Sequence, residues 1–216
     1  MNNRLPGYRQ SSLLLMLIFL LSIEGCGNKQ MRNFNAIPAF TQNHVNAVIE
    51  IPAGTNQKLE YNIEKKMFLV EQSNGSEQII DFLPSPGNYG FVPGTFLDPV
   101  MGGNGDPIDI LILSESLPTG TIIEVIPLLI LYFTIDPGVN SPVTVPKIIA
   151  VPASEGLRII NAVNYEELFD NYPEIVDILT IWFQRYNKEA GPIELKAMGD
   201  GEVAVNEIRK WDIMRF

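Results

Sequence analysis

Short apolar runs recur through the middle of the sequence, and many of their residues are β-branched. Such runs, when Gly, Pro, Asn or Ser bound them, are typical of β-strands. The pattern predicts strands at 45–51, 59–63, 67–71, 78–83, 108–113, 121–135 and 147–151. Residues 84–105 are rich in Gly and Pro, which predicts a loop. Glu124 and Pro127 interrupt the longest run, so it is neither a membrane span nor one uninterrupted central strand.

The pattern changes to a helical one near the C-terminus. A stripe at helical spacing consists of Ile175, Leu179, Trp182 and Tyr186. Pro173 suits the first position of this helix, with Asn171 as a candidate cap, and Gly191 is expected to end it. A second, short helix is predicted from Asp200 to Trp211. Strands followed by mainly C-terminal helices favour an α+β domain built on a small β-barrel.

The N-terminal segment has the pattern of a targeting signal. Arg4 and Arg9 precede an apolar run at 13–23, which is short for a transmembrane helix. Gly25-Cys26 then resembles the lipobox of bacterial lipoproteins. This resemblance implies a signal peptide at 1–25, lipidation of Cys26, and attachment to a membrane of the bacterial cell envelope. An uncleaved anchor, or an ordinary signal with a stray Cys, is the alternative.

Composition narrows the chemistry. The chain of 216 residues has a formal net charge of −10, which argues against a nucleic-acid partner and against a surface that binds anionic membranes through its overall charge. It contains a single Cys and a single His, His44, which excludes a disulfide framework, a Cys/His zinc site and a redox Cys pair. Residues 26–43 are polar and are predicted to form a tether to a domain at 44–216. Catalysis in that domain would depend on carboxylates, Lys, Tyr, Ser or a hard cation.

Candidate chemistry is concentrated in the segment Asn104-Gly105-Asp106-Pro107-Ile108-Asp109. Asp106 and Asp109 stand three positions apart where a predicted strand begins, so both carboxylates can converge on a hard cation. Taken alone, such a segment is more often an ordinary Asp-rich turn.

The residues around this segment resemble the soluble inorganic pyrophosphatases of family I. That family has the motif D-x-D-P-x-D, for which this sequence has N-G-D-P-I-D. The other matching pieces are Ile49-Glu50-Ile51-Pro52-Ala53, Lys58-Leu59-Glu60, Asn88-Tyr89-Gly90, Asp136, Lys147 and Tyr186. They occur in the family's order between about Val45 and about Ile208. The resemblance implies a five-stranded OB-type barrel with helices packed on it, and Mg²⁺-dependent hydrolysis of inorganic diphosphate to two phosphates.

The resemblance also implies a role for each matching residue. Asp106 would orient or deprotonate the attacking water, and Asp109 would bridge metal ions. The further metal-binding residues would be Glu50, Glu60, Asn104 and Asp136, and the residues that hold phosphate would be Lys58, Tyr89, Lys147 and Tyr186. The metal would be Mg²⁺, with Mn²⁺ as the alternative. Without the resemblance, Lys58 and Glu60 would be read as a solvated strand face and Tyr186 as a packing residue.

Several positions depart from the family pattern. Asn104 and Val145 stand where Asp is expected, Ser85 where Tyr is expected and Asn187 where Lys is expected, and 76–78 lacks an expected Arg. The loops at 96–103 and 137–144 are lengthened. These changes predict an impaired hydrolase of diphosphate or a related phosphoanhydride. The alternative is a non-catalytic envelope lipoprotein that binds metal, phosphate or a protein partner. Whether the family's homo-oligomer is retained stays open.

Overall fold

The structure is a computed structural model that describes residues 32–73, 75–136, 142–187 and 191–215. Contacts divide the chain into two units, Met1–Arg32 and Asn33–Phe216, and the fold below is that of the second unit. The predicted signal peptide and Cys26 lie outside the described residues. No helix in the described ranges is both long enough and apolar enough to cross a membrane.

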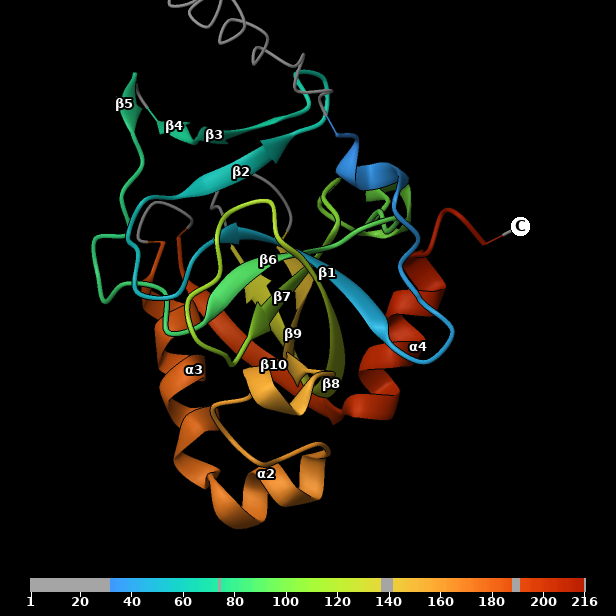
Figure 1. Cartoon of the computed structure of the whole chain (residues 1–216). Coiled ribbons are helices and arrows are strands. Elements are labelled where there is room, and N and C mark those ends of the chain that lie inside the picture. Colours follow the sequence, from blue (N-terminus) through green and yellow to red (C-terminus); the bar gives the residue numbers. More distant parts are fainter. Residues whose placement is uncertain (1–31, 74, 137–141, 188–190, 216) are drawn as a thin grey trace, which may run out of the picture. The chain divides into compact units, whose positions relative to one another are not determined.

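A six-stranded sheet forms the centre of the unit and closes into a barrel (Figure 1). In sheet order its strands are β1 (Val45–Ile51), β6 (Asn88–Val92), β7 (Ile108–Ile112), β9 (Val143–Pro152), β8 (Ile122–Ile135) and β10 (Ile193–Asp200). β8 also pairs with β1, so the first five strands form a closed ring, and β10 is added outside the ring at β8. β7 and β9 are parallel, and the other pairs are antiparallel. The prediction of a five-stranded OB-like barrel is confirmed.

Smaller elements lie outside the six-stranded sheet. They are the strands β2 (Leu59–Asn62), β3 (Met67–Val70), β4 (Gln72–Ser73) and β5 (Ser76–Glu77), and the 3₁₀-helices η1 (Phe34–Ala36), η2 (Pro99–Met101) and η3 (Glu155–Leu157). β2 and β3 form a hairpin whose turn includes Lys66, in a left-handed conformation with φ 51°. Phe34 packs edge-on against Tyr61 and Phe68, with ring centroids 5.2 Å apart in both pairs. This aromatic cluster fixes η1 to the hairpin.

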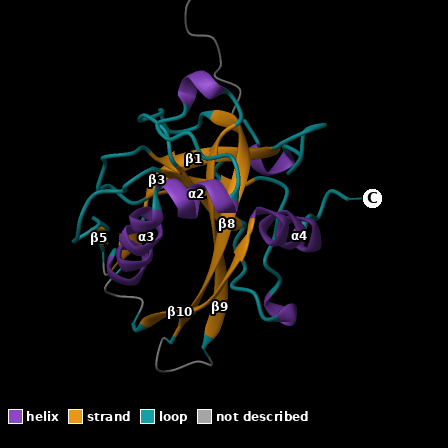
Figure 2. Ribbon diagram, turned by 90° about the horizontal axis from the view of Figure 1, so that it is seen from below, coloured by secondary structure: helices purple, strands orange, loops and turns teal. Residues whose placement is uncertain are grey.

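The helices pack on opposite sides of the sheet (Figure 2). They are α2 (Tyr165–Asn171), α3 (Pro173–Arg185) and α4 (Gly201–Trp211). Asp200 caps α4 as predicted, because its side chain accepts a hydrogen bond of 2.9 Å from the Val203 backbone N–H. The α4 face buries Ile208 and Trp211 against one strand face, and α3 buries Leu179 and Phe183 against the other.

One loop prediction and two strand predictions require correction. Residues 84–105 contain β6, a strand whose five residues are all buried between β1 and β7. The Gly and Pro content of this segment predicts a loop, but the hydrogen bonding of both edges of β6 to neighbouring strands outweighs it. Residues 78–83 form no strand, only an isolated bridge between Gln57 and Ile79. The strand predicted at 147–151 begins at Val143, and it is not the last, because β10 follows α3.

Two helix boundaries and one strand also differ from expectation. α3 ends at Arg185 rather than near Gly191, and Asn171 ends the unpredicted helix α2 rather than capping α3. β8 is continuous through Pro127, but its register with β9 shifts between Pro127 and Leu129. The irregularity coincides with a change of partner, because β1 pairs before it and β10 after it.

Gly90 is required by close backbone contact between β6 and β1. A Cβ atom at this position would lie 1.8 Å from the Val48 carbonyl oxygen. We therefore expect Gly90→Ala to destabilise the fold by about 3 kcal/mol, as overpacking does when backbone must move. The measurement is the free energy of unfolding by urea. Gly156→Ala is the control, because nothing lies within 4 Å of its Cβ, and equal losses for both variants would contradict the explanation.

Candidate active site

A cavity of about 270 Å³ opens at the end of the barrel near the β2–β3 hairpin. Its lining includes nine of the ten residues predicted for catalysis, metal or phosphate: Glu50, Lys58, Glu60, Tyr89, Asn104, Asp106, Asp109, Lys147 and Tyr186. The structure does not bring Asp136 to this lining; the residue follows β8, exposed, and its backbone N–H donates to the Pro192 carbonyl. A larger cavity of about 780 Å³ beside α4 contains none of these residues, so the smaller cavity is the candidate site.

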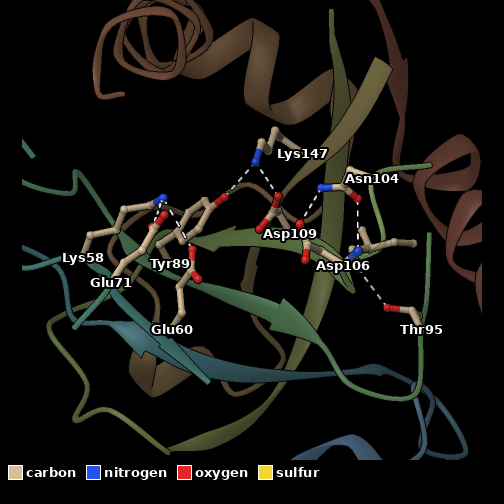
Figure 3. A network of polar contacts seen from close by, with 10 residues as sticks. Lys58, Glu60, Glu71, Tyr89, Thr95, Asn104, Asp106, Asp109 and Lys147 are labelled. Atoms are coloured by element: carbon tan, nitrogen blue, oxygen red, sulfur yellow. Dashed lines mark hydrogen bonds and ion pairs between the residues drawn. The ribbon is translucent and has the colours of Figure 1, made fainter. Parts of the chain in front are cut away.

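Lys147 forms the centre of the polar network (Figure 3). Parallel pairing of β7 and β9 puts Asp109 directly opposite Lys147, and the two side chains form an ion pair. The Lys147 ammonium also donates a 2.9 Å hydrogen bond to the Tyr89 hydroxyl. Burial alone would lower the pKa of Lys147, but the adjacent Asp109 carboxylate raises it above its usual value. The lysine therefore stays charged although it is buried.

Glu50 lies on β1 and is buried. Its carboxylate accepts a 2.7 Å hydrogen bond from the Tyr61 backbone N–H. Burial and, after it, the nearby acids Asp109, Glu60 and Asp106 raise the pKa of Glu50 to about 8, although that hydrogen bond acts to lower it. The side chain therefore favours its neutral form in the absence of a cation.

Lys58 and two glutamates form a second polar group on the hairpin side of the cavity (Figure 3). Lys58 forms an ion pair with Glu71 and lies 3.4 Å from Glu60. Burial alone would lower the pKa of Lys58, but its hydrogen bond to Glu71 and the nearby charges raise it. Burial raises the pKa of Glu60 to about 7. Sequence reasoning missed Glu71, although its backbone N–H bonds the Lys58 carbonyl, because only the pairing of β2 and β3 brings it near.

Asn104 positions Asp106. The Asn104 side-chain amide donates a 2.7 Å hydrogen bond to the Asp106 carboxylate, and the Asp106 backbone N–H donates to the Asn104 side-chain oxygen at 3.2 Å. Burial and the neighbouring Asp109 raise the pKa of Asp106. Thr95 holds the start of β7 by accepting a 3.0 Å hydrogen bond from the Ile108 N–H. The Asn104 amide thus binds the Asp106 carboxylate, which an Asp at position 104 would repel.

Some of the positions that depart from the family pattern line the same cavity, as Asn104 does. Val145 and Asn187 line it, and Tyr186 stacks on Trp182 with centroids 4.6 Å apart. Ser85 is buried and donates its hydroxyl to the Gly87 carbonyl. The basic residues among those that line the cavity are Lys58 and Lys147. The loop at 137–144 lies largely outside the described residues.

The donor set is suited to a hard cation. Carboxylate and amide oxygens gather around one small cavity, and these are the ligands that Mg²⁺ prefers. Within the described ranges, however, no group of three or more Asp, Glu, His or Cys side chains is arranged to hold a metal. The reason is visible in the contacts, since Lys147 holds Asp109 and Asn104 holds Asp106. A cation would need Asp109 to exchange its partner.

Comparison with known proteins defines the class first. A family model described as inorganic pyrophosphatase matches residues 47–213. With the barrel and the acid-rich cavity, this match makes the chain an enzyme of the diphosphatase class, which hydrolyses a phosphoanhydride.

Individual relatives then specify the family. An inorganic pyrophosphatase of Sulfolobus acidocaldarius is 30% identical over 170 residues, which cover 76% of this chain and 87% of that protein. One from Saccharolobus solfataricus is 32% identical, covering 74% and 84%. The crystal structure of an inorganic pyrophosphatase from Neisseria gonorrhoeae is similar with TM-score 0.66, 27% identity and coverage of 84% and 98%. The chain belongs to the soluble inorganic pyrophosphatases of family I, as the sequence motifs predicted.

The raised pKa of Glu50 predicts a pH-dependent stability. Ionising the buried carboxyl opposes folding, so its favourable contribution is complete below pH 4.5 and is lost as the pH rises to about 8. In buffer that contains a chelator, we compare the free energy of unfolding of Glu50→Gln with that of the unaltered protein. We expect this difference to shift in favour of the variant by up to about 1.4 kcal/mol per pH unit between pH 4.5 and about 8. Urea unfolding of both proteins at several pH values measures the difference. Glu166→Gln, on the exposed side of α2, is the control, and a pH-independent difference for Glu50→Gln would contradict the prediction.

Proposed function

We propose that this cavity hydrolyses inorganic diphosphate with Mg²⁺, or with Mn²⁺ as the alternative ion, at a rate lowered by the changed site residues. The observation that supports this most directly is the gathering of Asp106, Asp109 and Lys147 with the other predicted residues in one cavity. The relatives from Sulfolobus acidocaldarius and Saccharolobus solfataricus are named inorganic pyrophosphatase, after the same reaction. Glu50, Glu60 and Asp109 would hold the cation, and Asn104 would offer a neutral oxygen.

The contacts around Lys147 suggest how substrate and cation bind together. Lys147 now neutralises Asp109. Asp109 would hold the cation, and the Lys147 ammonium, once released from Asp109, would hold a phosphate oxygen. Lys58, Tyr89 and Tyr186 would hold further oxygens. Bound Mg²⁺ would supply charge neutralisation of the phosphate oxygens.

Asp106 is the candidate general base. Its raised pKa keeps it a stronger base than an exposed Asp, and the amide of Asn104 fixes its orientation. It would accept the proton of the attacking water while the water oxygen bonds to one phosphorus and the bridging P–O bond breaks. This assigns Asp106 to proton transfer and leaves Asp109 to the cation.

The altered positions support a lowered rate. Asn104 and Val145 remove two carboxylates from the family pattern, so the site attracts a cation less strongly. The missing Arg leaves Lys58 and Lys147 as the basic residues of the described lining, which reduces stabilisation of the transition-state charge. A relative without activity, which binds metal or phosphate in the envelope, is the alternative that the next experiment decides.

Location at the bacterial cell envelope belongs to the same proposal. The apolar run at 13–23 and the lipobox-like Gly25-Cys26 support lipidation of Cys26 and attachment to a membrane. Acyl chains stabilise such attachment by about 0.8 kcal/mol per buried CH₂. Mass spectrometry of the mature N-terminus would detect the acyl chains, and an unmodified Cys26 would contradict lipidation.

Removal of the proposed base should abolish most turnover. We expect Asp106→Asn to lower kcat for diphosphate by about 10²- to 10⁴-fold, the usual contribution of a general base. Phosphate release in Mg²⁺ and in Mn²⁺ measures it. Asp170→Asn, on the exposed side of α2, should leave kcat unchanged. If the folded unaltered protein releases no more phosphate than Asp106→Asn does, diphosphatase activity is excluded and the binding role is favoured.

Restoring the family carboxylate should strengthen cation binding. We expect Asn104→Asp to lower the Mg²⁺ concentration for half-maximal turnover several-fold, because another anionic oxygen joins the site. Without Mg²⁺ the variant should unfold at a lower temperature, since Asp106 then loses its amide donor. Asn206→Asp on α4 is the matched control. An unchanged Mg²⁺ requirement would argue against Asn104 as part of the metal site.

A further inference from the structure

The mouth of the cavity carries exposed apolar side chains on two loops. On the β2–β3 hairpin, Ile63 is 53% exposed and Met67 is 45% exposed. In η2, Val100 is 93% exposed and Met101 is 63% exposed. Ile63 itself lines the cavity, and Asn104, three residues after Met101, lines it too. Both loops therefore border the same opening, and neither apolar pair is needed for the core.

The second of these loops is longer than the family pattern that the sequence resembles. It falls within the residues at 96–103 that lengthen the chain beside the site. Extra residues that only connected β6 to β7 would be expected to be polar, because surface loops face water. Here the most exposed large apolar side chain among the described residues, Val100, sits on the lengthened loop. Such exposure is typical of a surface that meets a partner.

Positive charge accompanies the apolar residues on the hairpin. Lys65 and Lys66 are exposed at its turn, between Ile63 and Met67, and with the exposed Glu64 beside them they give the turn a net charge of +1. The whole chain has a net charge of −10, so two adjacent lysines stand out against their surroundings. Apolar side chains flanked by lysines match a phospholipid surface, where the former enter the interface and the latter meet anionic headgroups.

The path of the chain leads to the same rim. η1 packs on the hairpin through Phe34, and Asn35 lines the cavity beside Ile63 (Figure 1). Eight residues connect Cys26 to Phe34, and an extended chain spans at most about 3.5 Å per residue, which limits this reach to about 28 Å. A chain held to a bilayer at Cys26 therefore keeps η1 within about 28 Å of the lipid, and one held at Ile23, eleven residues before Phe34, keeps it within about 39 Å.

A second exposed apolar patch lacks these features. Ile178 and Ile181 on α3 are 56% and 54% exposed. Their exposed neighbours include Glu174 and Asp177, which anionic lipid would repel. The α3 patch therefore serves as an internal control, namely an exposed apolar surface with acidic rather than basic neighbours.

We infer that the rim formed by Ile63, Lys65, Lys66, Met67, Val100 and Met101 docks on a phospholipid bilayer. The cavity then opens at the membrane surface, and substrate reaches it along that surface. The inference concerns the orientation of the folded unit. It requires the chain to be held at the membrane by its N-terminal segment, but neither lipidation nor diphosphate turnover.

Lipid-borne quenching tests the orientation directly. The full chain with Cys26→Ser is placed on vesicles of phosphatidylethanolamine and phosphatidylglycerol through its apolar segment. An environment-sensitive dye is attached in turn to Met67→Cys, Val100→Cys and, as matched control, Ile178→Cys. We expect doxyl-labelled lipid to quench the dye at 67 and at 100 several-fold more than the dye at 178. Equal quenching at the three positions, or none at 67 and 100, would overturn the inference.

A separate pair of variants tests whether the hairpin lysines contribute to docking. Lys65→Glu should lower the quenching at position 100 on these anionic vesicles, whereas Lys196→Glu on β10 should not. Equal effects of the two substitutions would contradict a specific contact between the hairpin and the headgroups. Diphosphate turnover measured on the same samples is expected to be unchanged by Lys65→Glu, so a failure of docking and a failure of the proposed activity remain distinguishable.

Discussion

The buried ion pair of Asp109 with Lys147 is the contact on which the site depends, and the parallel pairing of β7 with β9 creates it. The buried Lys147 could not keep its charge there without the half-buried Asp109, because an unpaired buried ion is strongly destabilising. The same register gives Lys147 its contact with Tyr89. One strand pairing therefore brings together a carboxylate, an ammonium and a phenol from positions far apart in the chain.

Burial determines the charge state of the acids around this pair. Five carboxyl groups, those of Glu50, Glu60, Glu71, Asp106 and Asp109, lie close together, and their mutual repulsion would be large if all were ionised. Burial raises the pKa of Glu50 to about 8 and that of Glu60 to about 7, so protons reduce the charge. Lys58 and Lys147 neutralise part of the remaining negative charge. The fold can thus keep an acid-rich cavity stable without a bound cation.

Closure of the barrel explains why the least strand-like segment became a strand. β6 bridges β1 and β7, and without it the ring would be open along two edges with unpaired backbone groups. Gly90 allows the backbones to approach there, so the glycines that suggested a loop instead permit the pairing. The loop that follows β6 carries the exposed apolar side chains of Val100 and Met101.

The sequence by itself determined the family, the α+β class, the strands with strong apolar patterns, the capped helix at Asp200, and nine of the residues that meet in the cavity. These depend on local periodicity and on ordered motifs, which a linear reading detects. Only the tertiary structure decided the strands β6 and β10, the role of Glu71 beside Lys58, and the separation of Asp136 from the cavity. Each of these depends on partners distant in sequence, because burial and strand pairing can outweigh local propensity.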